Sequence, residues 1–159
     1  MSDSINFPPG FGLQNLVAWG NSGLVVLDKD SNTIVKSPHD EECVRFIVRE
    51  QQIYERFVER GGHNGVLRYD GTFGSGILLE YAPKHNLRSY LENHDADMKK
   101  KCCWAIQIAE ALDFIHLSGV IHGDLTWHNI LLDNGLNIKL ADYAGSSLDG
   151  SEFLMQIYH

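Results

Sequence analysis

Three oxygen-bearing side chains stand close together in the last third of the sequence. Asp124 and Asn129 lie in the segment His-Gly-Asp-Leu-Thr-Trp-His-Asn, between a long predicted helix and a tight predicted hairpin, and Asp142 follows that hairpin. A single Asp or Asn is ordinary in a loop. Together, carboxylate and amide oxygens suit Mg²⁺, a hard cation that also binds substrate phosphates. Phosphoryl transfer needs such a metal site and a carboxylate that accepts the hydroxyl proton, so the set predicts this chemistry.

A further carboxylate falls on the apolar face of a predicted helix. The helix is expected from about residue 40 to residue 60, and Glu50 shares one face with Ile47 and Tyr54. An unpaired carboxylate on that face would be costly. Lys36, at the end of the preceding predicted strand, is the cation expected to pair with it. A rotation of the helix that places Glu50 at the edge of the face is the alternative.

The elements that must position these residues are mostly strands in the first half. The apolar runs 24–27 and 33–36 flank a polar turn and predict a β-hairpin. Pro38, followed by acidic residues, is interpreted as the start of the helix. Two more strands are expected at residues 66–69 and 77–80, around a glycine-rich turn.

The second half is mainly helical. Helices are expected over residues 86–92 and 97–117, and strands over 130–132 and 137–140 around an Asn-Gly turn. The longer helix is expected to bury a stripe formed by Ile106, Ala109, Leu112 and Ile115. Strands followed by helices, without a regular βαβ alternation, predict an α+β fold.

Composition narrows the function classes. The formal net charge of −8 disfavours a general nucleic-acid binder, because phosphate contacts need basic surface. The apolar runs are too short to span a membrane. The odd number of cysteines, Cys43, Cys102 and Cys103, fits no closed disulfide framework, and the first residues lack a secretory pattern. We therefore expect a cytoplasmic or nuclear protein with no nucleic-acid or membrane partner; the oligomeric state stays unknown.

The motifs as a set resemble those of the eukaryotic-type protein kinase family. His122-Gly123-Asp124 resembles the HRD motif and Asp142-Tyr143-Ala144 resembles the DFG motif. The resemblance implies that Asp124 is the catalytic base and that Asn129 and Asp142 bind Mg²⁺. Trp19 to Val25 resembles the end of the glycine-rich loop, with Gly20 and Gly23 at glycine positions and Ala18 where the first glycine would stand.

The resemblance also implies how a nucleotide would bind. Lys36 corresponds to the strand lysine that contacts phosphates and Glu50 to its helix partner, and both would then serve catalysis. Leu79 would be the gatekeeper, and the backbones of Glu80 and Ala82 would meet the adenine edge. The adenine would lie between apolar side chains from the two halves: Val25, Ile34 and Leu131.

The implied fold is two-lobed: an N-lobe over residues 1–82, β-rich with one helix, and a partial helical C-lobe over 83–159. The implied function is ATP-dependent phosphoryl transfer to a Ser/Thr hydroxyl of a protein, with ATP and Mg²⁺. Two alternatives stay open: an impaired nucleotide-binding pseudokinase or scaffold module, and a small-molecule kinase of the aminoglycoside or choline type, in which His-Gly-Asp is at home.

Several positions depart from the family pattern. Gly123 replaces the arginine that grips a phosphorylated activation loop, so we expect activity that does not depend on loop phosphorylation. Thr126 replaces a basic residue, and Ala144 replaces the motif's glycine. No Ala-Pro-Glu motif follows Asp142. We therefore expect a chain truncated after the DFG-like motif; a fragment, an incomplete gene model and an unusual short protein are the alternatives.

Overall fold

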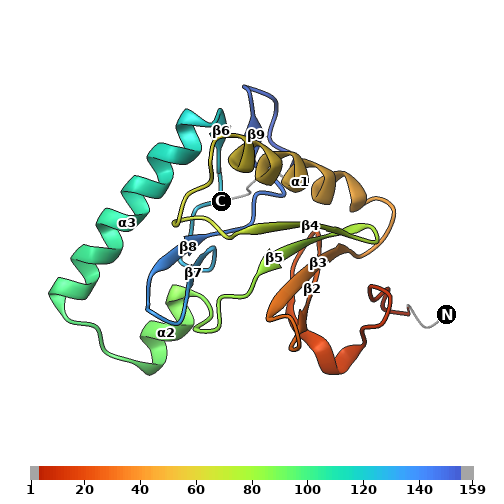
Figure 1. Ribbon diagram of the computed structural model, residues 1–159, viewed down its shortest axis with the longest axis horizontal. Coiled ribbons are helices and arrows are strands. Elements are labelled where there is room, and N and C mark those ends of the chain that lie inside the picture. The colour runs from red at the N-terminus through yellow and green to blue at the C-terminus, as the bar shows by residue number, and fades with distance from the viewer. Residues whose placement is uncertain (1–3, 155–159) are drawn as a thin grey trace.

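A five-stranded antiparallel sheet forms the first half of the computed structural model, which describes residues 4–154 (Figure 1). Its strand order is β1-β2-β3-β5-β4. Alternation of apolar residues in β2 and β3 gives the sheet two packed faces. The strands are β1 (Leu16–Trp19), β2 (Gly23–Asp28), β3 (Thr33–Pro38), β4 (Tyr69–Phe73) and β5 (Gly76–Glu80).

Helix α1 (Val44–Glu59) is amphipathic, lies beside the sheet and buries its largely apolar face against it (Figure 1). The buried face includes Glu50, as the helical spacing predicted. The interpretation of Pro38 as a helix start is wrong, because Pro38 pairs with Gly23 at the end of β3. Proline has no N–H to donate, so it fits the last position of a strand as well as the first turn of a helix.

The strand expected at residues 66–69 is also displaced. β4 begins at Tyr69 and runs through part of the predicted turn to Phe73, and the turn itself is confined to Gly74 and Ser75. A register shift between Tyr69 and Gly71 marks a bulge, and Gly71 has φ of 108°. A strand can accommodate a glycine at a bulge. Gly71 therefore lies within β4 and not in the predicted turn.

Within the described residues, the second half contains two helices and two short strand pairs, β6–β9 and β7–β8. Asn86 and Asp97 cap the helices by accepting hydrogen bonds from the backbone N–H groups of Ser89 and Lys100. The remaining elements are the short helix η1 (Leu13–Asn15), α2 (Leu87–Asn93), α3 (Met98–Leu117), β6 (Val120–Ile121), β7 (Ile130–Leu132), β8 (Ile138–Leu140) and β9 (Ser147–Leu148). The predicted α+β fold, a β-rich part with one main helix and a helical part, is confirmed.

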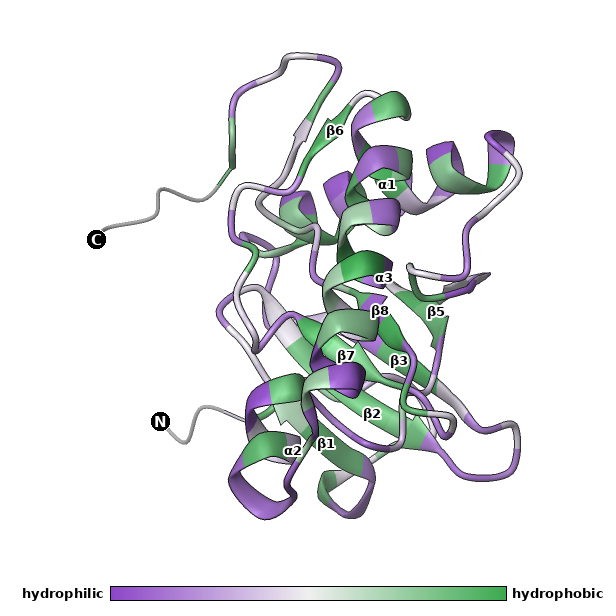
Figure 2. Cartoon of the chain, turned by 90° about the vertical axis from the view of Figure 1, so that its left-hand side faces the viewer, coloured by the Kyte–Doolittle hydropathy of each residue, from purple (hydrophilic) through white to green (hydrophobic). Residues whose placement is uncertain are grey.

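Helix α3 buries only part of the expected stripe, Ile115 fully and Leu112 in part. Its buried residues are Trp104, Ala111 and Ile115, whereas Ile106 is 59% exposed and Ala109 is also exposed. The Trp104 indole donates to the carbonyl of Leu136 at 2.8 Å, which ties the helix to the β7–β8 turn. Figure 2, in which α3 faces the viewer, shows apolar segments along the helix. Only a narrow strip of the helix surface is therefore buried, and the spacing of apolar residues alone did not identify this strip.

The main hydrophobic core lies between the sheet, α1, α3 and the β7–β8 hairpin. A smaller cluster of Leu24, Val26 and Val35 lies on the other face of the sheet, where Phe7 and Phe11 pack against it. The hairpin is anchored to the segment after α1, because Leu140 donates to the carbonyl of Gly65 at 2.7 Å. The two halves therefore share one core.

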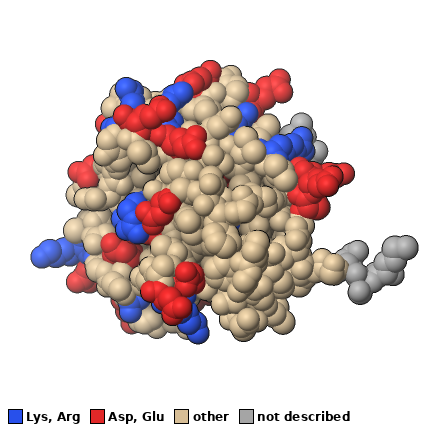
Figure 3. Space-filling view, turned by 45° about the vertical axis from the view of Figure 1, so that its right-hand side comes forward, with Lys and Arg blue, Asp and Glu red and all other residues tan. Residues whose placement is uncertain are grey.

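The surface carries charges of both signs. Figure 3 shows acidic and basic side chains interspersed over the left and upper parts of one face, while its lower right part carries neither. The net charge of −8 is thus not gathered into one patch on this face. Within residues 4–154, no helix combines the length and the apolar character needed to cross a bilayer.

Candidate active site

One cavity of about 420 Å³, between the sheet and the loop that contains Asp124 and Asn129, is lined by most of the predicted site residues. It is lined by backbone and side chains from β1, β2, β3, α1, β5 and the segment 124–142. Predicted residues that line it are Gly20, Gly23, Val25, Ile34, Lys36, Glu50, Leu79, Asp124, Asn129, Leu131 and Asp142. Residues more than a hundred positions apart in the sequence are therefore neighbours here.

Lys36 is the centre of the charged side of this cavity. Its ammonium lies 2.6 Å from Glu50 Oε2 and 3.0 Å from Asp142 Oδ1. The Glu50 side chain is 1% exposed and that of Lys36 11%, whereas the Asp142 side chain is 40% exposed. The predicted pairing of Lys36 with Glu50 is thus present, and Asp142 completes a triad that opens into the cavity.

Burial and charge act in opposite directions on the triad. Burial alone would lower the pKa of Lys36, but the carboxylates of Asp142 and Glu50 outweigh it and raise that pKa. Burial raises the pKa of Glu50, although Lys36 opposes this change. The Lys36 charge lowers the pKa of Asp142 despite burial. Asp142 is therefore held as a carboxylate, the form that binds a cation.

The residues after Asp142 fix its position. Asp142 has φ of 64°, the left-handed region in which a short polar side chain is tolerated. The next residue, Tyr143, is fully buried, and its N–H donates to Glu50 Oε1 at 3.3 Å. The Tyr143 ring packs edge-on against Tyr54 at 5.3 Å and lies 5.1 Å from the His122 ring. Aromatic packing thus connects α1 to the Asp124 loop.

The loop around Asp124 is built by His122 and Asn129. The His122 Nε2–H donates to the carbonyl of Ala141 at 2.8 Å, and its Nδ1 accepts from the Asp124 N–H at 3.2 Å. Both ring nitrogens are thus engaged, and burial lowers the pKa of this imidazole, as expected for a structural histidine. The Asn129 amide donates to the Asp124 carbonyl at 2.8 Å, so its side-chain oxygen is the atom left for a ligand.

The glycine-rich loop lines the cavity and has no room for a side chain at Gly23. The Gly20 N–H donates to the Gly23 carbonyl at 2.9 Å and closes a turn. A Cβ at Gly23 would overlap the carbonyl oxygen of Ser37 on β3. Glycine is therefore required at this point by the closeness of two backbones. The residues that sequence reasoning did not identify as cavity-lining are Trp19, Asn21, Ser22, Tyr54, Leu67, His128 and Ala141.

Glu80 and Ala82, whose backbones were predicted to meet the adenine edge, are not among the residues that line the cavity. Glu80 ends β5, and its side chain points away: it accepts from the Arg68 N–H at 2.8 Å and pairs with Lys139 at 3.2 Å. Ala82 is buried, and its carbonyl accepts from the His85 N–H at 3.2 Å. The role given to these two residues was a backbone contact, and it stays a prediction.

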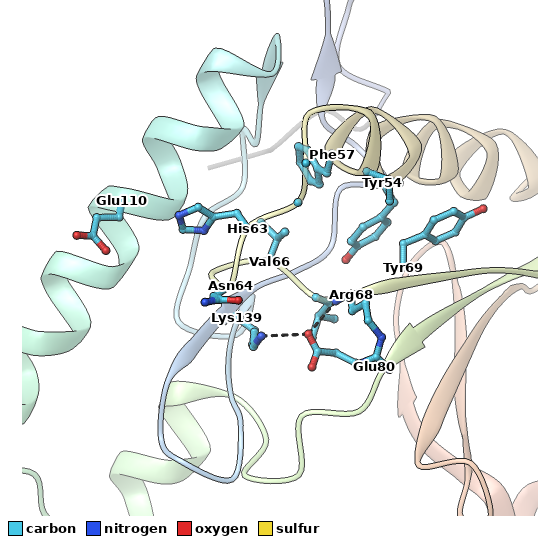
Figure 4. A pocket seen from close by; sticks show the side chains of 14 residues that line it. Tyr54, Phe57, His63, Asn64, Val66, Arg68, Tyr69, Glu80, Glu110 and Lys139 are labelled. Carbon is cyan, nitrogen blue, oxygen red and sulfur yellow. Dashed lines mark hydrogen bonds and ion pairs between the residues drawn. The ribbon is translucent and has the colours of Figure 1, made fainter.

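A second cavity, of about 650 Å³, is lined mainly by residues of α1 and of the segment 61–69, with single residues from β5, α3 and β8 (Figure 4). Its wall includes Tyr54 and Leu67, which line both cavities. Its cations are already paired, Lys139 with Glu80 and Arg68 with Asp70 at 2.7 Å. Apart from Glu80, no predicted site residue lies among the residues that line it.

Gly123, in the place of the HRD-type arginine, has a structural reason to be glycine. Its φ is 82°, and a Cβ there would lie 2.5 Å from the Phe153 ring. We expect Gly123→Ala to lower the free energy of unfolding, measured by urea denaturation, by more than the about 1–2 kcal/mol that the left-handed backbone alone costs a residue with a Cβ. Gly150→Ala is the matched control, because Gly150 has φ of 77° with nothing within 4 Å. Equal losses in the two variants would show that the contact with Phe153 is unimportant.

Two arginines of α1 hold the segment that follows Asp142. Arg49 donates to the carbonyl of Ser146 at 2.7 Å. Arg56 forms a bidentate pair with Asp149 at 2.9 and 2.8 Å and also donates to the Ser118 carbonyl at 3.0 Å. This clasp, formed by Arg56 and Asp149, fastens the β9 end of the segment to the helix that carries Glu50.

Comparison with known proteins agrees with this geometry. Residues 29–149 match the family described as protein tyrosine and serine/threonine kinase. The chain is 38% identical over 74 residues to serine/threonine-protein kinase PKH2 of Saccharomyces cerevisiae, which covers 45% of this chain and 7% of that protein. It is 34% identical over 91 residues to serine/threonine-protein kinase PDK1 of Cryptococcus neoformans, and the match covers 54% of this chain and 7% of that protein.

NUAK family SNF1-like kinase 1 of Homo sapiens is 36% identical over 83 residues, which covers 52% of this chain and 13% of that protein. The matched parts thus span only 7–13% of the length of these curated relatives. The family match itself covers more than half of the chain and includes Lys36, Glu50, Asp124 and Asp142. The chain therefore belongs to the protein tyrosine and serine/threonine kinase family.

Proposed function

We propose that the chain binds ATP with Mg²⁺ and transfers the γ-phosphoryl group to a serine or threonine hydroxyl of a protein. The observation that supports this most is the placement of the Lys36–Glu50–Asp142 triad, Asp124 and Asn129 around one cavity. The choice of Ser/Thr rests on the printed names of PKH2 and PDK1, both serine/threonine-protein kinases.

The cavity offers distinct surroundings to the two ends of a nucleotide. Val25, Ile34 and Leu131 provide apolar contacts from both halves, which suits a planar base, with Leu79 at the back. Backbone groups of Glu80 and Ala82 would bind the edge of the base. Lys36 supplies the positive charge that phosphates need, and the glycines at Gly20 and Gly23 let the loop backbone come close to them.

The donor set fits Mg²⁺. Asp142 provides a carboxylate with a lowered pKa, and Asn129 provides an amide oxygen whose NH₂ group is already engaged with the Asp124 carbonyl. Mg²⁺ in such sites takes only one or two protein carboxylates or amides and completes its shell with water and phosphate oxygens. Within residues 4–154 no group of three His, Cys, Asp or Glu forms a closed metal site, which is compatible with this sparse set. When bound, the ion would neutralise phosphate charge.

We propose that Asp124 is the residue that acts on the acceptor hydroxyl. In the transfer, the hydroxyl oxygen forms a bond to the γ-phosphorus, the bond from that phosphorus to the β–γ bridging oxygen breaks, and ADP leaves. Asp124 accepts the proton of the hydroxyl group. Thr126 replaces a basic residue at this loop, so less positive charge faces the transferring group, and we expect a low turnover number.

Nucleotide binding is the first expected result to test. With MgATP at about a hundred times its Kd, the melting temperature of the chain should rise by roughly 5–10 °C. Asp142→Asn removes the charge that would hold Mg²⁺ and should abolish most of this rise. Differential scanning calorimetry with and without Mg²⁺ measures it.

The outcomes separate the candidate functions. Asp30→Asn, on the exposed turn between β2 and β3, is the matched control and should melt like the unmodified chain with MgATP. A rise with no phosphate incorporated into casein or myelin basic protein would favour a nucleotide-binding scaffold. A folded chain without any rise would refute the proposal.

A further inference from the structure

We propose that His39 is a positioning residue for the glycine-rich loop, holding residues 18–23 in the shape that receives the nucleotide; this inference rests on the proposed function. His39 directly follows β3, whose last residue, Pro38, pairs with Gly23. The end of the strand that carries Lys36 therefore lies beside the loop. The histidine is outside every motif from which the site was predicted.

The first contact is a hydrogen bond to the loop backbone. His39 Nε2 lies 2.6 Å from the carbonyl oxygen of Gly20. A carbonyl oxygen only accepts, so Nε2 carries the hydrogen and donates it. The other ring nitrogen, Nδ1, is buried without a hydrogen-bond partner in residues 4–154. The bond to Gly20 is thus the polar contact that orients the ring.

The second contact is a stack with the loop's aromatic residue. The Trp19 and His39 rings lie 4.1 Å apart between centroids, at an interplanar angle of 32°. Trp19 is 56% exposed and lines the nucleotide cavity at the end of β1. The imidazole covers one face of this largely exposed indole, so one side chain contacts both Trp19 and Gly20, the two consecutive residues that lead into the turn.

The loop needs such support from outside because its internal bonding is sparse. Its closing hydrogen bond joins the Gly20 N–H to the Gly23 carbonyl, and the two residues between them, Asn21 and Ser22, form a bend. A segment rich in glycine loses much conformational freedom when it is ordered. A loop that is already fixed by His39 loses less when the nucleotide binds, which increases affinity.

The test separates the hydrogen bond from the stack. His39→Phe keeps an aromatic ring under Trp19 and removes the donor, whereas His39→Gln keeps an N–H at nearly the same reach and removes the stack. In His39→Phe without nucleotide, amide hydrogen exchange over residues 18–23 should accelerate about three- to tenfold. The Kd for MgATP, measured by titration calorimetry, should rise by a similar factor. In His39→Gln, which keeps the donor, the increases in exchange rate and in Kd should both be much smaller.

The matched control is His94→Phe. His94 also stacks on an aromatic ring, Tyr90 at 4.3 Å, and its Nδ1 lies 3.1 Å from a backbone carbonyl, but it follows α2 and does not line the cavity. It should leave exchange over residues 18–23 and MgATP affinity unchanged. Unchanged exchange in His39→Phe would overturn the proposal. Faster exchange with unchanged MgATP affinity would also overturn it, since the contact would then hold the loop without positioning a nucleotide.

Failure of the proposed function looks different. If the unmodified chain does not bind MgATP, calorimetry gives no heat for any variant, while the exchange experiment still reports whether His39 holds the loop. The absence of heat would refute the nucleotide-binding role of the cavity. Accelerated exchange confined to residues 18–23 would still support the contact between His39 and the loop.

Discussion

Asp124→Asn should reduce phosphoryl transfer about 10²- to 10⁴-fold while MgATP affinity stays within a factor of about two. Asparagine keeps the shape of the side chain but cannot accept the hydroxyl proton. The backbone contacts of Asp124, its N–H to His122 Nδ1 and its carbonyl to the Asn129 amide, do not involve the carboxylate. The loop should therefore keep its conformation. Incorporation of labelled phosphate into a protein acceptor measures the rate, and calorimetry measures the Kd.

A matched variant is Asp133→Asn, in the β7–β8 turn, where the carboxylate only accepts hydrogen bonds from neighbouring turn residues such as Gly135 and Asn137. It should leave transfer within about twofold of the unmodified rate. If Asp124→Asn transfers phosphate as fast as Asp133→Asn, Asp124 is not the proton acceptor. If both variants lose transfer together with their melting transition, the rate would have to be measured again with Asp124→Glu.

Lys36→Met should lower the free energy of unfolding by roughly 3–5 kcal/mol at neutral pH, because it leaves Glu50 buried without its cation. Glu50 is 1% exposed, and burial already raises its pKa in the presence of Lys36. Without the lysine, Asp142 would add repulsion where it now shares the ammonium. Urea unfolding followed by circular dichroism measures the loss.

The pH dependence of this variant has a definite sign. A carboxyl group whose pKa is higher in the folded chain than in the unfolded chain favours the folded state below its unfolded pKa, and this contribution is lost as pH rises through the folded pKa. The deficit of Lys36→Met should therefore shrink as pH falls towards the ordinary glutamate pKa of about 4.3. A deficit that is independent of pH would contradict the assignment to Glu50.

Two further variants sharpen the comparison. Lys29→Met, on the exposed β2–β3 turn, removes a lysine that makes no ion pair among residues 4–154 and should change stability by less than about 0.5 kcal/mol. Lys36→Met combined with Glu50→Gln removes both charges but keeps a side-chain oxygen for the Tyr143 N–H, and should recover much of the lost stability. No recovery would mean that Lys36 acts through Asp142 rather than through Glu50.

The helical spacing around Glu50 predicted its burial correctly because a long amphipathic helix packs one continuous face on a sheet. The turns at residues 28–32 and 133–135 were also predictable, since their polar residues favour local hydrogen bonds within the turn, as between Ser31 and Asp28 at 2.8 Å. In both cases the sequence signal and the structure arise within a few neighbouring residues.

Other features depend on contacts between distant segments and were predicted less well. Ile106 on α3 belongs to an apolar stripe at helical spacing, which predicts burial, yet it is exposed. The position of the β7–β8 turn, which accepts the Trp104 hydrogen bond, decides which side of the helix is covered. β4 was displaced because a bulge, rather than a turn, accommodates Gly71. His39 carried no motif, and its role depends on β3 ending beside the loop, which is a matter of register.

The clasp between Arg56 and Asp149 makes ionic strength relevant to α1. Both side chains are partly exposed, Arg56 at 29% and Asp149 at 59%, so dissolved ions reach the pair and screen it. The Lys36–Glu50 pair, near the middle of the same helix, is almost inaccessible to them. Salt should therefore loosen the C-terminal part of the helix from the segment after Asp142, while the middle of the helix, which faces the cavity, stays fixed.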